Sequence, residues 1–405
     1  MIEGPLHSDD PVTRVMHGKP VDFVPVAQVY ESLGPLQYLR TERSWQLWRK
    51  RLQATNTDVL PLDYETYLDH QLEIETGILT DIYTRPAWVG LRRNMTCEEV
   101  AGSAIIRREN NLFWLAANGD ASWIAPTLQG AEARSGSRWA DLWDRGDTAE
   151  ALARAAAEPE RALHLIPQPT SEQVSAVLGS TIYDLARALA AHFKDNLPQY
   201  ITGSTPYNDL PYLLGFQAFM SAMAEMPERV HQVLQKHRPQ PSARLSAERQ
   251  LGISLIHIEE CLASADLISP RMYLEFAFPY DKLAVQFYED MGFRTMLYFS
   301  GNLMPFLKYL KKLPFTALSF EEDRKNYGIN LGEVRRALGP DRVIFGNLDA
   351  MFVEKASDDE VLSEVKRQLS VAGRSNFILS AGSPLTPGTS LDRIRLLTES
   401  TRRIG

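Results

Sequence analysis

The chain has 405 residues, of which 44% are hydrophobic and 23% are charged, so it is long enough to bury a large core. Its formal net charge of -8 argues against a general nucleic-acid-binding protein, which usually carries a basic surplus. Its two cysteines, Cys97 and Cys261, do not indicate a disulfide framework and favour a reducing compartment. The N-terminal residues lack a basic segment followed by an apolar one, and no run of about 18 apolar residues occurs. We therefore expect a cytoplasmic protein without a secretory signal or a membrane span.

The first third of the chain contains short predicted elements. Residues 9–19 and 44–55 have the pattern of helices, whereas 21–29 and 58–62 have the pattern of strands. From residue 73 to about 140, short alternating runs are separated by turn residues, and we predict antiparallel hairpins there. The runs are 77–83, 88–93, 104–107, 112–116 and 122–124. The hairpins are interpreted as an insertion into a larger domain, with a separate small β domain as the alternative.

The rest of the chain alternates between strands and helices. Predicted helices at 148–158 and 178–193 precede a predicted strand at 199–202, and helices follow at 213–225 and 227–235. Later strands are predicted at 253–258, 294–299, 315–320, 342–346 and 376–380. Helices between and after them are predicted at 270–291, 303–312, 332–338, 358–371 and 390–401. Such alternation indicates parallel βαβ units.

Counting the predicted strands gives eight, starting near residues 21, 57, 199, 252, 294, 315, 342 and 375. The predicted fold class is therefore α/β, as a (β/α)8 TIM-type barrel that forms one domain over residues 1–405 with the insertion at about 73–140. A doubly wound open sheet is the alternative. The first strand is not followed by a Gly-rich phosphate loop, which counts against a dinucleotide-binding version of that sheet.

Polar side chains follow most of the later strands, and sites in α/β folds are built at the carboxyl ends of strands. Glu259 and Glu260 are adjacent, so in an extended strand one should face the mouth of the barrel and the other its wall. Paired carboxyl groups in such a mouth can raise one pKa and supply a general acid. His257 is either a proton carrier or a core residue of an apolar strand. Cys261 is either a nucleophile or a small buried thiol.

Two further strand ends offer hydrogen-bonding groups. Tyr298 and Ser300 are two residues apart and should project to one side, where their hydroxyl groups can donate hydrogen bonds to an anionic substrate group. Asn347 and Asp349 have the same spacing. Glu321 either belongs to the site or pairs with the basic residues at 324 and 325.

The second half resembles the uroporphyrinogen decarboxylase superfamily. In residues 252–282 a strand ends in Glu259-Glu260, and Ser269-Pro270 leads into a helix with an aromatic-Pro-Tyr element, as in that superfamily. Residues 298–302 lie where its corrinoid-linked methyltransferases have His-x-Cys-Gly. Residues 345–349 are similar to its Gly-Asn-hydrophobic-Asp strand end, and 378–387 to its last strand and loop. The resemblance runs from about residue 199 to the C-terminus and implies a TIM-type barrel and a homodimer.

The resemblance also shows departures in the methyltransferase branch, where a His and two Cys hold zinc. The matching positions here are Tyr298, Ser300 and Ser383. Zinc prefers thiolate, imidazole or carboxylate ligands, whereas a phenol has a pKa near 10 and a serine hydroxyl stays protonated at neutral pH. We therefore expect this zinc site to be absent and no metal or other cofactor to be needed.

A divalent metal held by carboxylates is the alternative, because oxygen ligands suit Mg²⁺, Mn²⁺ or Ca²⁺. The carboxylates in question are Glu259, Glu260, Glu321 and Glu322, which are otherwise expected to be hydrogen-bonded at the barrel rim.

The decarboxylase branch matches incompletely as well. Its first strand leads into an Arg-rich loop, but residues 26–31 contain no Arg, and the position of its last-strand His is near Ala381. Its acidic residue after the second strand corresponds to Asp63 or Glu65, and its Tyr after a Gly-Pro loop corresponds to Tyr207 or Tyr212. Uroporphyrinogen carries many carboxylates and would need cationic partners, so we expect another, small polar substrate.

These features together predict a metal-independent lyase, similar to a decarboxylase, that acts by acid/base catalysis. The expected catalytic residues are Asp63, Glu65, Glu259, Glu260 and Tyr298. The expected substrate-binding residues are Tyr207, His257, Ser300, Asn302, Glu321, Asn347 and Ser383. The expected partner is a small-molecule substrate, with no nucleic acid and no membrane. The alternatives are a methyltransferase that works with a corrinoid carried on a partner protein, and a non-catalytic descendant that binds a ligand.

Overall fold

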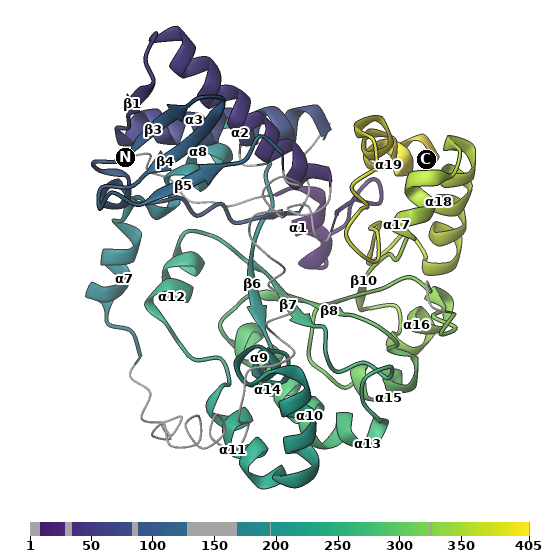
Figure 1. Cartoon of the computed structure of the whole chain (residues 1–405). Coiled ribbons are helices and arrows are strands. Elements are labelled where there is room, and N and C mark those ends of the chain that lie inside the picture. Colours follow the sequence, from purple (N-terminus) through teal and green to yellow (C-terminus); the bar gives the residue numbers. More distant parts are fainter. Residues whose placement is uncertain are drawn as a thin grey trace.

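A computed structural model describes residues 9–28, 35–82, 88–127, 168–194, 196–323 and 326–404 (Figure 1). The predicted helix at 148–158 lies outside these residues, as do the basic residues at 324 and 325. Within the described ranges, no helix is both long enough and apolar enough to cross a membrane. The strands form two sheets, a large parallel one and a small antiparallel one.

Seven parallel strands make the larger sheet, in the order β11-β10-β9-β8-β7-β6-β2. Their bounds are β2 (Val89–Gly90), β6 (Gln199–Ser204), β7 (Leu255–Glu260), β8 (Arg294–Phe299), β9 (Ala317–Phe320), β10 (Val343–Phe345) and β11 (Phe377–Ile378). In the predicted first strand, Val26 forms a parallel bridge with Leu379, directly after β11. The parallel segments thus follow chain order across the sheet, and the first segment lies beside the last.

The parallel sheet is curled. Trp88, just before β2, stacks on Tyr200 of β6 with ring centroids 4.6 Å apart, and it meets Phe345 of β10 edge-on at 5.0 Å. β9, β8, β7 and β6 separate β10 from β2 in the sheet order, so this contact requires the sheet to wrap around a common interior. Helix α1 (Pro11–Met16) adds Val12 and Met16 to the same inner core. Among the described residues no strand pairing joins Val26 to β2, so the structure shows a half-barrel of parallel strands.

The prediction that residues 58–62 form a barrel strand is wrong. This run is β1 (Val59–Pro61), which pairs antiparallel with β3 (Ala104–Arg108) in the smaller sheet. The place beside β6 belongs to β2, which was predicted to be part of a hairpin. A run of three apolar residues has no periodicity that would distinguish an edge strand from a buried one. Val59 in fact remains 49% exposed.

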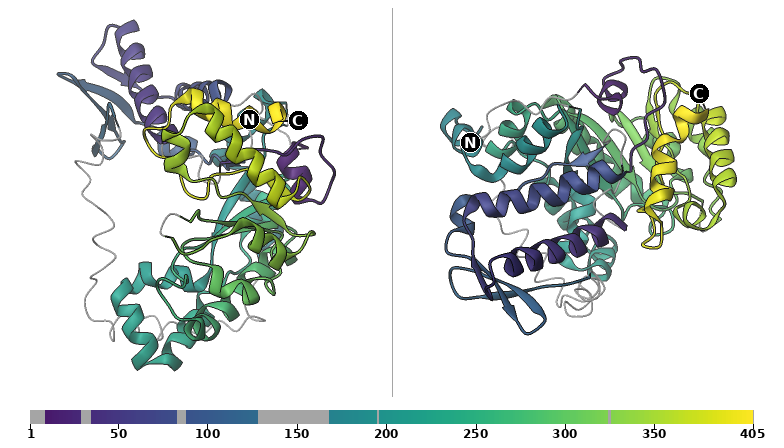
Figure 2. Two further views of the ribbon diagram at one scale, coloured as in Figure 1. Left: turned by 90° about the vertical axis from the view of Figure 1, so that its right-hand side faces the viewer. Right: turned by 90° about the horizontal axis from the view of Figure 1, so that it is seen from above.

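The smaller sheet has the order β1-β3-β4-β5. β4 (Asn111–Leu115) and β5 (Ala121–Ile124) continue it as an antiparallel meander through the turns at 109–110 and 116–120. The run at 77–83, also predicted as a strand, instead lies largely within helix α3 (Tyr64–Ile82). Helix α3 runs beside α2 (Pro35–Ala54), as Figure 2 shows, and β1 lies between these two helices in the chain.

Helices alternate with the parallel strands in the second half of the chain and bury their apolar faces in a large outer core. Their bounds are α7 (Ser171–Leu178), α8 (Asp184–His192), α9 (Pro206–Leu214), α10 (Phe216–Glu225), α11 (Pro227–Lys236), α12 (Ala243–Gln250), α15 (Leu307–Leu310), α16 (Leu331–Leu338), α17 (Ala350–Lys355), α18 (Asp358–Ala372) and α19 (Leu391–Ile404). Most of these agree with the predicted helices within a few residues.

The predicted helix at 270–291 is interrupted. It comprises α13 (Pro270–Met272), a π-helical turn η4 (Tyr273–Ala277) and α14 (Phe278–Asp290). Pro279 explains the interruption, because proline has no N–H and its ring collides with the carbonyl group four residues earlier. The wider turn brings Tyr273 and Asp281 to face the same buried region.

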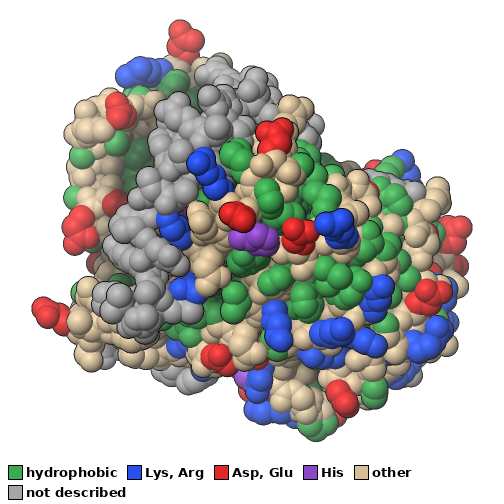
Figure 3. Space-filling model, turned by 90° about the horizontal axis from the view of Figure 1, so that it is seen from below, with side chains coloured by type: hydrophobic (Ala, Val, Ile, Leu, Met, Phe, Trp, Pro, Cys, Tyr) green, Lys and Arg blue, Asp and Glu red, His purple; other side chains and the backbone are tan. Residues whose placement is uncertain are grey.

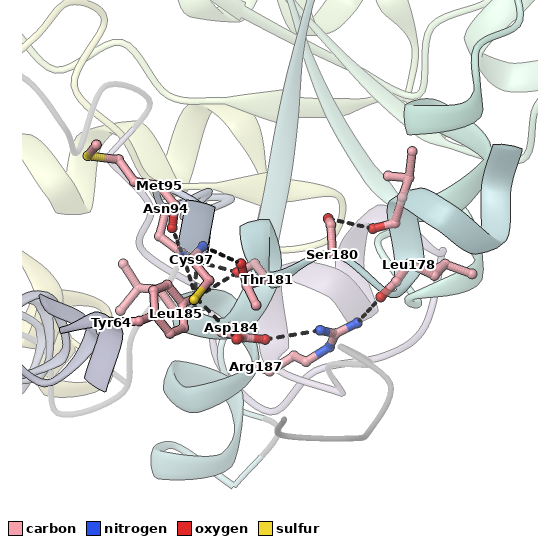
Figure 4. Close-up of polar contacts among 11 residues, drawn as sticks. Tyr64, Asn94, Met95, Cys97, Leu178, Ser180, Thr181, Asp184, Leu185 and Arg187 are labelled. Carbon is pink, nitrogen blue, oxygen red and sulfur yellow. Dashed lines mark hydrogen bonds and ion pairs between the residues drawn. The ribbon is translucent and has the colours of Figure 1, made fainter. Parts of the chain in front are cut away.

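A polar junction fastens the loop after β2 to α3 and to the start of α8 (Figure 4). Asn94 Nδ2 donates to Tyr64 Oη at 2.8 Å, and Asn94 Oδ1 accepts from the backbone N–H of Leu185 at 3.0 Å. Asp184 accepts from Tyr64 at 3.1 Å and pairs with Arg187 at 3.3 Å. Burial raises the pKa of Tyr64 to about 12, so its hydroxyl stays a donor at neutral pH. The junction fixes α3 against the parallel sheet.

Candidate functional site

Strand alternation sorts the predicted site residues between the two faces of the curled sheet. On β7, Leu255 packs into the inner core, whereas Ile256 and Ile258 pack against the outer helices. Side chains two apart share a face, so Glu259 lies on the inner side and Glu260 on the outer side. Glu259 is half-buried and Glu260 is fully buried. The expectation that one acid faces the mouth and the other the wall agrees with this arrangement.

Hydroxyl and carboxyl groups form a hydrogen-bonded group at the ends of β8, β9, β10 and β11. We call it the β8–β11 cluster, and its members are Tyr298, Ser300, Glu321, Glu322, Asn347, Gly382 and Ser383. Tyr298 Oη donates to the carbonyl oxygen of Gly382 at 3.0 Å. Ser300 Oγ donates to Glu321 Oε1 at 2.8 Å, and Ser383 Oγ donates to Glu322 Oε1 at 3.0 Å. Each hydroxyl is thereby committed to a partner within the protein.

Glycine is required at position 382. A Cβ atom there would lie 2.6 Å from the backbone nitrogen of Glu322 and 2.7 Å from its Oε2 atom. The chain after β11 therefore lies against the backbone after β9. Tyr298, at the end of β8, hydrogen-bonds to the same residue, Gly382. Glycine at 301 has a comparable reason, because its φ is +74° and a Cβ would lie 2.5 Å from Ser264 Oγ.

The β8–β11 cluster does not fit a thiolate-bound zinc ion. The side chains at the three zinc positions, Tyr298, Ser300 and Ser383, carry neutral hydroxyl groups that donate to a carbonyl or a carboxylate, so none of them supplies the thiolate or imidazole ligand that zinc prefers. Nor do the four glutamates converge, because Glu260 lies on the opposite face of its strand from Glu259. Among the described residues, no group of three or more His, Cys, Asp or Glu side chains is arranged to hold a metal.

A second group of polar side chains lies at the ends of β6 and β7. We call it the β6–β7 cluster, and its members are Ser204, Asn208, Asp209, Tyr212, Glu259 and Cys261. Asn208, in the first turn of α9, donates from Nδ2 to Ser204 Oγ at 3.1 Å and accepts at Oδ1 from the backbone N–H of Cys261 at 2.9 Å. One side chain thus ties together the ends of both strands.

The acids of the β6–β7 cluster are perturbed by their surroundings. Burial raises the pKa of Asp209, although a hydrogen bond from Ser204 and the nearby His237 partly oppose that rise. Burial also raises the pKa of Tyr212, with further contributions from Cys261 and Glu259. A carboxyl group with a raised pKa beside hydrogen-bond donors is an arrangement suited to moving protons.

Glu260 has its own partners behind the sheet. Its Oε2 atom accepts from Thr205 Oγ1, and its Oε1 atom accepts from the backbone N–H of Leu262 at 3.2 Å. Asp281 of α14 lies close enough to Glu260 for each carboxyl group to perturb the other, and it accepts from Tyr273 Oη at 3.2 Å. Both carboxyl groups are completely buried, and burial raises the pKa of Glu260 to about 7 and that of Asp281 well above its usual range.

The structure does not bring every predicted residue to these clusters. Asp63 and Glu65 are exposed at the start of α3, where Asp63 Oδ1 accepts from the N–H of Thr66. They follow β1 of the antiparallel sheet, so they do not lie at the carboxyl end of a parallel strand. Tyr207 and His257 are buried, with Tyr207 packed on Phe219 and His257 set between aromatic rings of the inner core.

Asn302 lies in the loop after β8 and caps the next turn through a bond from the N–H of Met304. Two residues that the sequence reading did not select, Asn208 and Asp209, belong to the site region. Their signal was the polar stretch that runs from the end of β6 into the first turn of α9, where both residues follow Pro206. Asp281 gave no signal, because it lies within a helix and only the fold places it against Glu260.

Figure 3 views the molecule from below, the side on which α9 and α14 lie in Figure 1. Hydrophobic side chains cover much of this face, and acidic, basic and histidine side chains lie together near its middle. Tyr212 and Leu213 of α9 and Leu274 of η4 are among the exposed apolar residues of these elements.

Comparison with known proteins agrees with this architecture. A family model described as uroporphyrinogen decarboxylase matches residues 155–404, more than half of the chain. Uroporphyrinogen decarboxylase of Myxococcus xanthus is 27% identical over 183 residues, which are 45% of this chain and 50% of that protein. The enzyme of Crocosphaera subtropica is 25% identical over 190 residues, 46% of this chain and 51% of its own length. The match thus spans about half the length of these curated relatives.

A solved structure described as a methyltransferase from Methanosarcina mazei superposes with a TM-score of 0.59 at 17% identity and covers 99% of both chains. At that identity the likeness concerns the fold alone, and it extends the common architecture to almost the whole chain. The family match, the order of the parallel strands and the polar strand ends all lead to one assignment. The chain belongs to the uroporphyrinogen decarboxylase family.

Proposed function

We propose that this protein is a lyase, similar to a decarboxylase, that acts by acid/base catalysis on a small polar substrate at the β6–β7 cluster. The observation that supports this proposal most is the placement of Asp209 with Glu259, Tyr212 and Ser204 at two adjoining strand ends. Asp209 has a carboxyl pKa raised by burial, so a fraction of it carries a proton when the exposed acids do not.

In the proposed reaction, loss of CO2 leaves an electron pair on the substrate carbon, and the proton of Asp209 neutralises it. Glu259 stabilises positive charge on the substrate, and Tyr212 donates a hydrogen bond because its pKa is raised and its hydroxyl stays protonated. Ser204 and Asn208 orient polar substrate groups at the same strand ends. No step is assigned to a metal, because the side chains at the zinc positions of the methyltransferase branch are hydroxyl donors.

The β8–β11 cluster supports one wall of the proposed site. Its hydroxyl groups are paired with carboxylates and a carbonyl of the protein itself, so their proposed role is to fix the neighbouring strand ends. Asn347 Nδ2, which reaches the carbonyl oxygen of Glu321 at 3.4 Å, serves the same purpose.

The test begins with metabolite profiling of purified protein to identify a substrate that is consumed. Asp209→Asn and Glu259→Gln should then each lower kcat by about 10²- to 10⁴-fold, the range for loss of a general acid or base. Matched controls are Asp120→Asn and Glu98→Gln, which remove exposed acids in the antiparallel region. Unchanged turnover in both site variants, with the fold intact by circular dichroism, would reject the assignment.

Methyl transfer is the second activity to assay, because the structure with a similar fold over nearly the whole chain is described as a methyltransferase. That activity would need a methyl donor such as a corrinoid on a partner protein. Methyl transfer by the purified chain without decarboxylation of any tested acid would favour this reading over the first.

We also propose that the parallel segments close into a complete (β/α)8 barrel, with the antiparallel strands as an insertion. The chain-order arrangement of eight parallel segments and the bridge between Val26 and Leu379 support closure. An experimental structure that shows hydrogen bonds between the 26–28 segment and β2 would establish it, and a gap filled by side chains there would overturn it.

A further inference from the structure

The pair formed by Glu260 and Asp281 lies outside the mouth and needs a separate explanation. Both side chains are 0% exposed, and two ionised carboxylates in such a place would repel each other strongly. The charged or titratable groups that act on the pair are Asp209, Tyr207 and Tyr212 from α9 and Tyr273 from η4. All four are acids or phenols, so none of them supplies a compensating positive charge.

Hydrogen-bond geometry points the same way. Thr205 and the N–H of Leu262 donate to Glu260, and Tyr273 donates to Asp281 Oδ2. Asp281 Oδ1 is buried and has no donor among the described residues. Two carboxyl groups can hydrogen-bond to each other only when one of them carries a proton, and that proton would give Oδ1 its missing partner.

The pair also connects to the mouth through a continuous series of contacts. Glu260 accepts from Thr205 Oγ1, the same Oγ1 accepts from the N–H of Asn208, and Asn208 Oδ1 accepts from the N–H of Cys261. These contacts fix the ends of β6 and β7, which carry Ser204 and Glu259. A group that acts through other residues in this way is a positioning group.

We propose that Glu260 and Asp281 share a proton at neutral pH, with protonated Asp281 donating to Glu260, and that this proton-bound pair positions the β6–β7 cluster from behind the sheet. The positioning part rests on the proposed function, whereas the shared proton does not. No metal or co-reactant is needed, because the proton is taken from water as the chain folds.

The sign of the pH effect follows from the direction of the two shifts. Both acids bind a proton more tightly in the folded chain than in the unfolded chain, so the folded state holds more protons above the ordinary carboxyl pKa. The pair's contribution to stability is therefore complete below the ordinary carboxyl pKa of about 4, and it is lost progressively as the pH rises from there through the raised pKa values, of which that of Glu260 is about 7.

The first experiment is infrared spectroscopy of the full chain during a pH titration. The wild type should show the carbonyl stretch of a buried protonated carboxylic acid at neutral pH, and it should disappear only at alkaline pH. Glu260→Gln and Asp281→Asn should each shift or remove this band. Glu75→Gln is the matched control, because Glu75 is a buried acid held between Arg40 and Arg92, and it should leave the band unchanged.

A second measurement keeps the proposal testable if a variant folds poorly. The urea midpoint of the wild type should fall relative to that of Asp281→Asn, which cannot ionise at this position, as the pH rises from about 4 to about 7 and beyond. Absence of the infrared band in the wild type, together with a difference between the two midpoints that does not change with pH, would overturn the shared proton.

Turnover tests the positioning part. With a substrate in hand, Asp281→Asn should retain kcat within about threefold at neutral pH and lose less activity at alkaline pH than the wild type, whereas Asp281→Ala should lower kcat at least about tenfold. Equal kcat in Asp281→Ala and the wild type would overturn positioning while leaving the shared proton in place. If no variant and no wild-type sample turns over any substrate, the proposed function fails, and the infrared and urea results still decide the pair.

Discussion

The hydroxyl group of Tyr298 donates a hydrogen bond to the carbonyl oxygen of Gly382, 3.0 Å away. Both residues are buried, and the bond joins the end of β8 to the segment after β11 across β9 and β10. By donating this hydrogen bond, the Tyr298 hydroxyl stabilises the curvature of the sheet. It stands at the position where the methyltransferases of the resembled superfamily have a histidine ligand.

Replacing Tyr298 by Phe should lower the free energy of unfolding by about 1 to 2 kcal/mol, because the buried carbonyl of Gly382 loses its donor. Urea unfolding followed by circular dichroism measures the change. Tyr309→Phe is the control, since Tyr309 is only half-buried, and its effect should stay below about 0.5 kcal/mol. Equal stability of the Tyr298 variant and the wild type would contradict the proposed role of this bond.

Replacing Gly382 by Ala should be more damaging than the loss of that hydrogen bond. The added Cβ atom would lie 2.6 Å from a backbone nitrogen of Glu322, and a backbone atom gives way less easily than the end of a side chain. We expect a loss of about 2 to 3 kcal/mol, at the upper end of the range for overpacking. A variant with the wild-type urea midpoint would show that the two chain segments separate without cost.

Zinc should not bind at the hydroxyl groups of the β8–β11 cluster. Elemental analysis of dialysed protein should find no zinc bound at these hydroxyls. Ser300→Ala and Ser383→Ala should therefore have the same zinc content as the wild type, because the two hydroxyls donate to Glu321 and Glu322. A triple variant with Tyr298→His, Ser300→Cys and Ser383→Cys offers zinc the ligand types it prefers and should retain the ion. Stoichiometric zinc in the wild type, lost in both serine variants, would contradict the hydrogen-bonded description.

Two buried histidines should make the protein sensitive to acid. Burial lowers the pKa of His70, which stacks on Trp48 at 3.6 Å, to about 3, and it lowers that of His257 to about 3 as well. The unfolded chain therefore binds more protons between about pH 3 and about pH 6.5, and stability falls as the pH decreases through that range.

Each histidine should contribute at most about 1.4 kcal/mol per pH unit to this fall. His257→Gln, which does not titrate, should reduce the slope of the unfolding free energy against pH by about one proton. Urea unfolding at several acidic pH values measures that slope. An unchanged slope in the variant would mean that His257 is protonated inside the folded protein.

Arg335 should be among the most important residues for stability outside the site. Its guanidinium group donates to the carbonyl oxygens of Ala372 at 2.8 Å, Arg342 at 2.7 Å and Asn376 at 2.8 Å, which links α16 to the starts of β10 and β11. Arg335→Ala should lower the free energy of unfolding by about 3 kcal/mol, and Arg335→Lys should recover little, because an ammonium group lacks the planar fork. Full recovery by Lys would show that charge alone matters.

Local sequence patterns were enough to predict most strands and helices in the second half of the chain. Strands such as β8 are continuous apolar runs, and helices such as α18 begin at capping residues, so local physics sets their type and approximate bounds. The sequence also predicts polar groups at the carboxyl ends of the parallel strands. A buried strand is an apolar run, so the polar residues that follow the run mark the end of the strand. The alternation of side chains along a strand predicts that Glu259 and Glu260 face opposite sides of the sheet.

Tertiary structure decided the remainder. Residues 59–61 could pair with either sheet, and only long-range packing assigned them to β3 and gave the place beside β6 to β2. Asp63 and Glu65 therefore do not lie at the end of a parallel strand. The partners of Glu260 come from α9 and α14, and those of Tyr298 from the segment after β11, at sequence separations that no local pattern encodes. Hydrogen bonds and pKa shifts depend on which groups meet and how completely water is excluded, and both are properties of the folded chain.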